Sequence, residues 1–150
     1  DEHPCLDRDG YGFSKYMMEE VTRYGHRQNE EIDVINLRLS SVLADDHLPD
    51  PKRVGPIRQW ALGGITVMAR QDAVKAFAMA AESDHKPGVR VMNASAPRAW
   101  VADPVGDILR NWWGEDVDAS YFDQPGCEFD SVYDVSKIRD ELGFVAEILP

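Results

Sequence analysis

The fold and the chemistry of this 150-residue chain centre on the sequence DGYGFSK, residues 9–15, which continues directly into YMMEEV, residues 16–21. Tyr11 and Lys15 are four residues apart, so in a helix they lie on one face, one turn from each other. Apolar residues recur at helical spacing from Phe13 onward, and this pattern predicts a helix over residues 11–24.

The predicted helix has a start signal, a stop signal and one apolar face. Asp9 is a candidate cap before the first turn, and Gly25 is a stop signal after the last one. We expect one apolar stripe to pack on a sheet, formed by Phe13, Met17, Val21 and Tyr24.

A tyrosine beside a lysine has a specific chemical use. A phenol titrates near pKa ~10, and a fixed ammonium within about 4–6 Å favours the phenolate form. Such a tyrosine can take a proton from a substrate hydroxyl or return one to a carbonyl. A hydroxyl that loses a proton while its carbon loses a hydride is an alcohol being oxidised, which implies a nicotinamide cofactor. The bare spacing is also compatible with an ordinary exposed helix face.

The residues around this pair narrow the choice. The pattern Tyr11-Gly12-x-Ser14-Lys15 followed by Glu19 resembles the active-site helix of the extended short-chain dehydrogenase/reductase family, the NAD(P)-dependent epimerase/dehydratase group. The segment YDVSKIRDELGF, residues 133–144, is similar to the C-terminal helix of that family, in which Asp134 would be the cap and Phe144 a core anchor. The resemblance runs from about Glu2 to the C-terminus.

Composition limits the partners and the location of the protein. The formal net charge is −11, with 27 acidic and 16 basic residues, which disfavours nucleic acid and anionic membranes. No apolar run approaches the roughly 18 residues that span a bilayer. Cys5 and Cys127 have no metal-ligand spacing, so we expect free thiols, no metal site and a cytoplasmic protein.

The rest of the chain alternates between strands and helices. Strands are predicted at 32–39, 65–68, 89–93 and 121–122, from β-branched residues and alternation. A helix capped by Asp72 precedes the third of them, with an apolar face formed by Ala73, Val74, Phe77, Ala78 and Ala81. The predicted fold class is α/β: a Rossmann-like parallel-sheet fragment with a small mixed α/β region that covers the substrate.

The resemblance also implies site residues at the end of the first strand. Open α/β sheets bind ligands beyond the carboxyl ends of their strands. The resemblance places the backbone of Leu39 and Ser40 near the nicotinamide, and Ser41 at the position of a family asparagine that faces the substrate. Both serines are equally compatible with a plain strand-to-loop transition.

The substrate itself is left open. Arg58, in the loop-rich segment 44–64, is the candidate to bind an anionic group of the substrate. Sugar-nucleotide members of the family often carry an arginine for the diphosphate at the position where Ile65 stands here. This departure puts a diphosphate sugar in doubt without narrowing the class further. The expected substrate is a sugar, a sugar nucleotide or a related secondary alcohol.

The resemblance assigns roles to the central pair. Tyr11 is the expected acid/base, and Lys15 favours its phenolate and holds the nicotinamide ribose, so both belong to the catalytic and the cofactor site. The cofactor is NAD or NADP. Epimerisation, dehydration and oxidation all begin with such a hydride step, so the reaction subtype stays open.

One part of the family pattern is missing. The sequence contains no Gly-x-x-Gly-x-x-Gly turn, which in the family cradles the cofactor pyrophosphate at a helix N-terminus. We therefore expect residues 1–150 to be the C-terminal half of such a domain and to be inactive alone. The competing hypothesis is a non-catalytic fragment or binding module that keeps the family scaffold.

The helix over residues 11–24 is also the expected dimer surface. Met18 lies between Ser14 and Thr22 on a stripe that the apolar face does not use. The resembled family commonly dimerises by pairing this helix with its two-fold mate, so we expect a homodimer contact centred near Met18. An ordinary exposed methionine is the alternative.

Overall fold

Two parallel strands form the centre of the fold. The structure is a computed structural model that describes residues 9–44, 48–57 and 62–148. Strand β1 (Asp33–Leu39) pairs in parallel with β4 (Gly88–Ala94), from Asp33 opposite Gly88 to Leu39 opposite Ala94. Beyond their carboxyl ends, β2 (Ser41–Leu43) pairs in parallel with β3 (Val67–Ala69). The α/β fold class with parallel strands is confirmed, and three of the four predicted strands occur within two residues of their predicted bounds.

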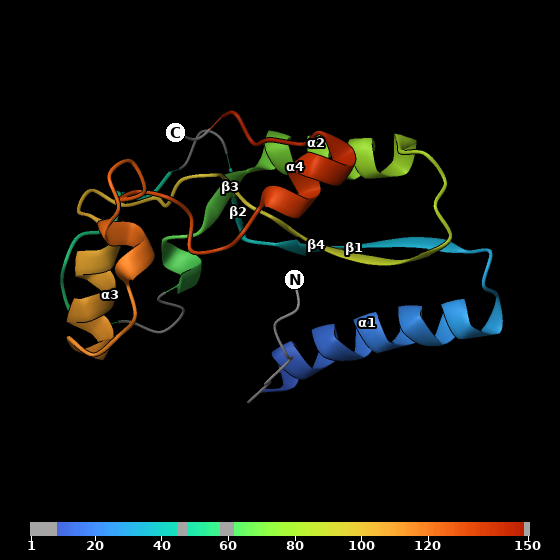
Figure 1. Cartoon of the computed structure of the whole chain (residues 1–150), viewed down its shortest axis with the longest axis horizontal. Coiled ribbons are helices and arrows are strands. Elements are labelled where there is room, and N and C mark those ends of the chain that lie inside the picture. The colour runs from blue at the N-terminus through green and yellow to red at the C-terminus, as the bar shows by residue number, and fades with distance from the viewer. Residues whose placement is uncertain (1–8, 45–47, 58–61, 149–150) are drawn as a thin grey trace.

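Helices cover both faces of the strands. Helix α1 lies on one face, and α2 and α4 lie on the opposite face (Figure 1). Helix α3 and two short 3₁₀ helices belong to a smaller part at the carboxyl end of the strands (Figure 1). Their bounds are Gly10–Gln28 for α1, Arg70–Glu82 for α2, Val105–Trp113 for α3, Ser136–Leu142 for α4, Leu62–Gly64 for η1 and Ser120–Asp123 for η2. Within the described residues, none of these helices is long and apolar enough to cross a membrane.

The apolar core lies between the strands and the pair α2 and α4. Its largest fully buried members are Met68, Met92, Ile138 and Phe144, which come from β3, β4, α4 and the segment after it. A second cluster beneath α3 includes Val105 and Leu109. Helix α1 contributes no residue to either cluster.

The start of α1 agrees with prediction, and its end does not. Asp9 is the N-cap, and its Oδ1 accepts a hydrogen bond from the Gly12 amide at 2.7 Å. The helix continues through Gly25 to Gln28, and the amide of Asn29 donates to the carbonyl of Gly25. The stop at Gly25 was therefore wrong, because a single glycine lowers helix stability without preventing the helix from continuing.

The predicted packing face of α1 was also wrong. All four stripe residues are exposed: Phe13 by 55%, Met17 by 42%, Val21 by 63% and Tyr24 by 58%. The only buried residue of the helix is Glu19. Helix α1 thus turns a polar face toward the strands and an apolar face away from them.

Helix α2 shows a comparable reversal. Asp72 does not cap the helix; its buried carboxylate accepts hydrogen bonds from the amides of Glu147 and Ile148. Ala73 and Ala76 face the core, whereas Val74 and Phe77 are more than half exposed. The prediction had assigned these two to the buried face.

The C-terminal segment is closer to expectation. Phe144 is buried in the core, as predicted. The expected cap at Asp134 was wrong: Val135 is the N-cap of α4, and Asp134 Oδ1 accepts a hydrogen bond from the amide of Ser136 at 2.8 Å. Gly143 ends α4 in the left-handed region at φ 70°, a conformation that glycine adopts without steric cost. Residues 121–122, predicted as a strand, belong to the 3₁₀ helix η2.

Candidate functional site

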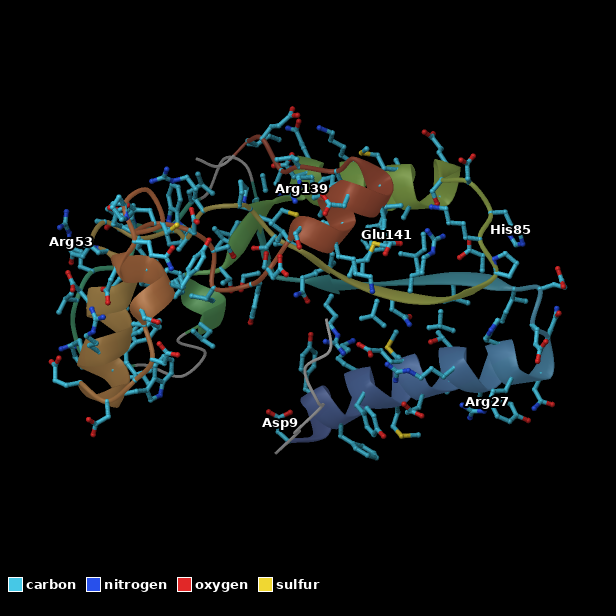
Figure 2. The ribbon with its side chains drawn as sticks, viewed as in Figure 1. Asp9, Arg27, Arg53, His85, Arg139 and Glu141 are labelled. Carbon is cyan, nitrogen blue, oxygen red and sulfur yellow. The ribbon has the colours of Figure 1, made fainter. Side chains whose placement is uncertain are left out.

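The first turns of α1 carry the tyrosine and lysine together. The Nζ atom of Lys15 lies 5.0 Å from the centroid of the Tyr11 ring, so the ammonium stands over the aromatic face. Both side chains are exposed. The Asp9 cap fixes the start of the helix two residues before Tyr11 (Figure 2). The predicted pair is therefore formed within the helix itself, on a surface that a ligand can reach.

Two contacts define where this turn lies along the strand. Asn36 Nδ2 donates to Thr22 Oγ1 at 2.9 Å, and Arg38 Nε donates to Glu19 Oε1 at 2.7 Å. Moving toward the start of α1 thus means moving toward the carboxyl end of β1. In Figure 2, Arg27 at the other end of α1 lies on the same side of the molecule as His85, which precedes β4. The antiparallel course brings the Tyr11 turn to the carboxyl ends of the parallel strands.

Two buried serines mark those carboxyl ends. Ser40 directly follows β1, and its amide donates to the carbonyl of Ala94 at 3.0 Å. Ser95 directly follows β4 and is 2% exposed. The hydroxyl oxygens of Ser40 and Ser95 are buried and have no hydrogen-bond partner among the residues that the structure describes. Such groups are costly to leave unpaired, so each one calls for a physical explanation.

The remaining predicted site residues behave differently. Ser41 Oγ donates to the carbonyl of Gly63 at 2.6 Å, so this hydroxyl holds η1 against the start of β2. Leu39 is 40% exposed at the end of β1. Arg58 lies outside the described residues. Ile65 is completely buried, which removes it from any contact with a ligand.

Sequence reasoning missed how the loop before η1 is held. The indole of Trp100 donates to the carbonyl of Pro49, and that of Trp112 to the carbonyl of Gly55. The carboxylate of Asp103 accepts from the amide of Val54 at 2.8 Å. Side chains around α3 therefore fix the backbone of residues 49–55, which the resemblance assigned to substrate covering. Tryptophan and aspartate near a helix start were visible, but their partners some 50 residues away were not.

The charged residue nearest to the site pair on α1 is Glu19. Its two carboxylate oxygens accept from Nε and Nη2 of Arg38 at 2.7 and 3.0 Å, and Arg23 adds a contact at 3.1 Å. The hydrogen bond from Arg38 is the largest cause that lowers the pKa of Glu19, and the charges of both arginines act in the same direction. Glu19 is therefore a buried, ionised anchor one turn beyond Lys15.

A separate cleft of about 610 Å³ lies between η2 and the first turn of α4. At its wall the hydroxyl of Tyr121 donates to Asp130 Oδ2 at 2.7 Å, and this bond raises the pKa of Tyr121. Sequence reasoning gave Tyr121 no role beyond a strand. Over the ranges that the structure describes, no group of three or more histidine, cysteine, aspartate or glutamate side chains forms a metal site.

Comparison with known proteins adds one structural likeness. No protein-family model matches the chain, and no curated protein matches it. Its fold is similar to that of a UDP-glucose 4-epimerase from Bifidobacterium longum, whose crystal structure contains NAD+ and UDP, with a TM-score of 0.60 and 18% sequence identity. The match covers 98% of this chain and 53% of the epimerase chain. The likeness shows the fold, and this chain spans about half the length of the epimerase chain that it matches.

Proposed function

We propose that this chain is the C-terminal, substrate-side half of an NAD(P)-dependent enzyme of the epimerase/dehydratase group. The observation that carries the proposal is the position of Tyr11 and Lys15. They stand together on α1 at the carboxyl ends of two parallel strands, where open α/β sheets bind their ligands. The fold likeness to an epimerase whose structure holds NAD+ and UDP supports the same reading.

The proposed chemistry starts at Tyr11. Its phenolate takes the proton of a substrate hydroxyl, and its phenol returns a proton to the carbonyl in the reverse direction. Lys15 stands beside it, with its Nζ 5.0 Å from the centroid of the Tyr11 ring. The nicotinamide, when bound, accepts the hydride from the substrate carbon. The substrate class is a sugar, a sugar nucleotide or a related secondary alcohol.

The residues near the strand ends fit a nicotinamide cofactor in part. The Ser40 amide is already used by the Ala94 carbonyl, so it cannot bind a ligand. The Ser40 hydroxyl is buried and has no partner, which suits a group that gains a hydrogen bond when the cofactor carboxamide arrives. Lys15, whose Nζ stands over the Tyr11 ring, would hold the nicotinamide ribose in the same site. A pyrophosphate cradle has to come from the other half of the proposed domain.

Three exposed features support a missing half. In the described part of the chain, β1 pairs only with β4, so its other edge is open. The apolar stripe of α1 and the exposed Val74 and Phe77 of α2 lie on opposite faces of the strands. A unit that adds parallel strands to β1 would cover the open edge of that strand. We propose that the nucleotide-binding half does so.

The test uses the full natural protein. We expect NAD(P)+ reduction, or isomer exchange, on at least one member of a panel of sugars, sugar nucleotides and secondary alcohols. Tyr11→Phe keeps the ring and removes the acid/base, so turnover should fall by about 10²–10⁴-fold. Tyr24→Phe makes the same chemical change on an exposed part of the same helix and is the matched control.

Two outcomes would contradict the proposal. Near-normal turnover of Tyr11→Phe would remove the role given to Tyr11. Absence of both turnover and NAD(P) binding in the full natural protein would favour the alternative, a binding module that keeps the scaffold.

A further inference from the structure

Helix α1 is attached to the strands by polar contacts. Glu19 forms a two-pronged ion pair with Arg38 of β1, and Thr22 accepts a hydrogen bond from Asn36 of the same strand. Arg23 contacts Glu19 from within the helix. No residue of α1 belongs to an apolar cluster. The side-chain hydrogen bonds that join this helix to β1 thus come from a carboxylate, a guanidinium, an amide and a hydroxyl.

The opposite face of the helix presents a physical problem. Phe13, Met17 and Val21 all point away from the strands and are between 42% and 63% exposed. Burying such side chains is favourable because it removes apolar surface from water. If burial alone decided the rotation of α1 about its axis, the helix would turn this stripe toward the sheet.

The buried carboxylate of Glu19 opposes that rotation. Turning the helix would break both hydrogen bonds between Arg38 and Glu19 in a partly buried place. Breaking a partly buried ion pair is unfavourable because it removes the mutual compensation of two desolvated charges. The bidentate geometry also holds Glu19 in a narrow range of directions, because both oxygens meet a planar guanidinium.

The direction of Glu19 determines the direction of the site pair. Residues four apart on a helix differ by about 40° in direction, so Tyr11, Lys15 and Glu19 follow one slowly turning stripe. Lys15 lies one turn from Glu19, and Tyr11 lies two turns from it. A rotation of α1 that moves Glu19 away from Arg38 moves both site residues by the same angle.

We propose that Glu19 and Arg38 are positioning residues that set the rotation of α1 and thereby direct Tyr11 and Lys15 toward the carboxyl ends of the strands. The catalytic consequence rests on the function proposed above, whereas the structural consequence does not. The pair acts through the helix and touches no ligand. A misplacement of about 1 Å can lower catalytic rates by roughly 10²-fold, so a modest rotation is sufficient.

The test separates positioning from stability. Replacing a buried ion pair by two apolar residues is often neutral or stabilising, so Glu19→Leu combined with Arg38→Leu should keep the fold. The double substitution removes the ion pair between Glu19 and Arg38, which holds the helix in one rotation. It also leaves apolar residues on both sides of α1. Thermal unfolding checks that the double variant is folded. Glu20→Gln is the matched control, because Glu20 pairs with Arg23 of the same helix.

The first readout is structural and uses the 150-residue chain. Methionine methyl groups are labelled, and a soluble paramagnetic probe reports which of them face solvent. We expect Met17 to be broadened by the probe in the parent and in Glu20→Gln, and to be protected in the double leucine variant. Met68, which is fully buried, serves as the internal reference. If Met17 stays as exposed in the folded double variant as in the parent, the pair does not set the rotation.

The second readout is turnover in the full natural protein. We expect kcat of the double leucine variant to fall by about 10–100-fold while KM for the substrate changes little. The reason is that the variant changes the orientation of Tyr11 and Lys15 relative to the reacting atoms. The Glu19→Gln variant keeps the shape of the side chain and weakens its pair with Arg38, so methyl exposure and kcat should change in the same direction but less. This variant also tests the positioning role if the double leucine variant does not fold. A Glu19→Gln protein with parent-like methyl exposure and kcat would overturn the proposal.

The two proposals fail in different ways. If Tyr11→Phe lowers turnover and the double leucine variant does not, the positioning role is wrong and the proposed function stands. If Tyr11→Phe has no effect, the proposed function is wrong, and the methyl exposure still decides whether Glu19 and Arg38 set the rotation.

Discussion

Replacing Ser95 by alanine should make the protein more stable. The Ser95 side chain is 2% exposed, and its hydroxyl has no hydrogen-bond partner. An unsatisfied buried polar group costs about 1–3 kcal/mol, and alanine removes the hydroxyl without changing the rest of the side chain. Taking the lower value to allow for partial relaxation, we expect the free energy of unfolding to rise by about 1 kcal/mol, which is about 2–4 °C in Tm for a chain of this size.

A matched variant at the same end of the strands makes this result interpretable. Thr66, just before β3, is 1% exposed, and its Oγ1 donates to the carbonyl of Leu62 at 2.7 Å. Thr66→Val removes a buried hydroxyl that is paired, so it should lower the free energy of unfolding by about 1 kcal/mol. Urea denaturation with an unchanged m-value, checked by calorimetry, measures both variants. If Ser95→Ala is destabilised as Thr66→Val is, the Ser95 hydroxyl has a partner in solution and the reasoning is refuted.

Three further predictions concern the cofactor, pH and assembly. The 150-residue chain alone should bind NAD(H) and NADP(H) negligibly, and micromolar binding in titration calorimetry would contradict the need for another half. The pKa of Glu19 is lowered in the folded state, so its stabilising contribution is present above about pH 4.5 and is lost as pH falls through the folded pKa. The Glu19→Gln variant should therefore show a flatter decline of the free energy of unfolding below about pH 5 than the parent does. An unchanged slope would show that the ion pair is not formed. Met18 is 60% exposed, and Met18→Glu should turn a dimer of the full natural protein into a monomer by light scattering, whereas a monomeric parent would exclude this helix as the dimer surface.

Local patterns in the sequence were enough to predict most elements. The strands predicted at 32–39 and 89–93 from alternation and β-branched residues occur as Asp33–Leu39 and Gly88–Ala94. Asp9 begins α1 and Gly143 ends α4 by local backbone rules, which need only neighbouring residues. The spacing of Tyr11 and Lys15 likewise placed them side by side before any tertiary contact was known.

Tertiary contacts were beyond the reach of those patterns. Asp72 was predicted as a cap because it starts a helical pattern, but its carboxylate binds amides of residues 147 and 148, some 75 positions away. Helical periodicity found the apolar stripe of α1 correctly and cannot say which side meets the sheet. The buried hydroxyls of Ser40 and Ser95 belong to the same class, because burial without a partner depends on the whole surrounding structure.

The polar attachment of α1 and its exposed apolar stripe have a common explanation. A helix that must meet apolar surface on its outer side cannot also rely on apolar burial to hold its inner side, because the two faces would compete for the sheet. A bidentate ion pair avoids this competition, since Glu19 fits Arg38 and nothing on the stripe can replace it. The helix then keeps one rotation whether or not its outer face is covered. The turn that carries Tyr11 and Lys15 is therefore oriented by contacts within this chain. The proposed second half needs to supply a cofactor cradle and a covering surface, but it does not need to set the orientation of these two side chains.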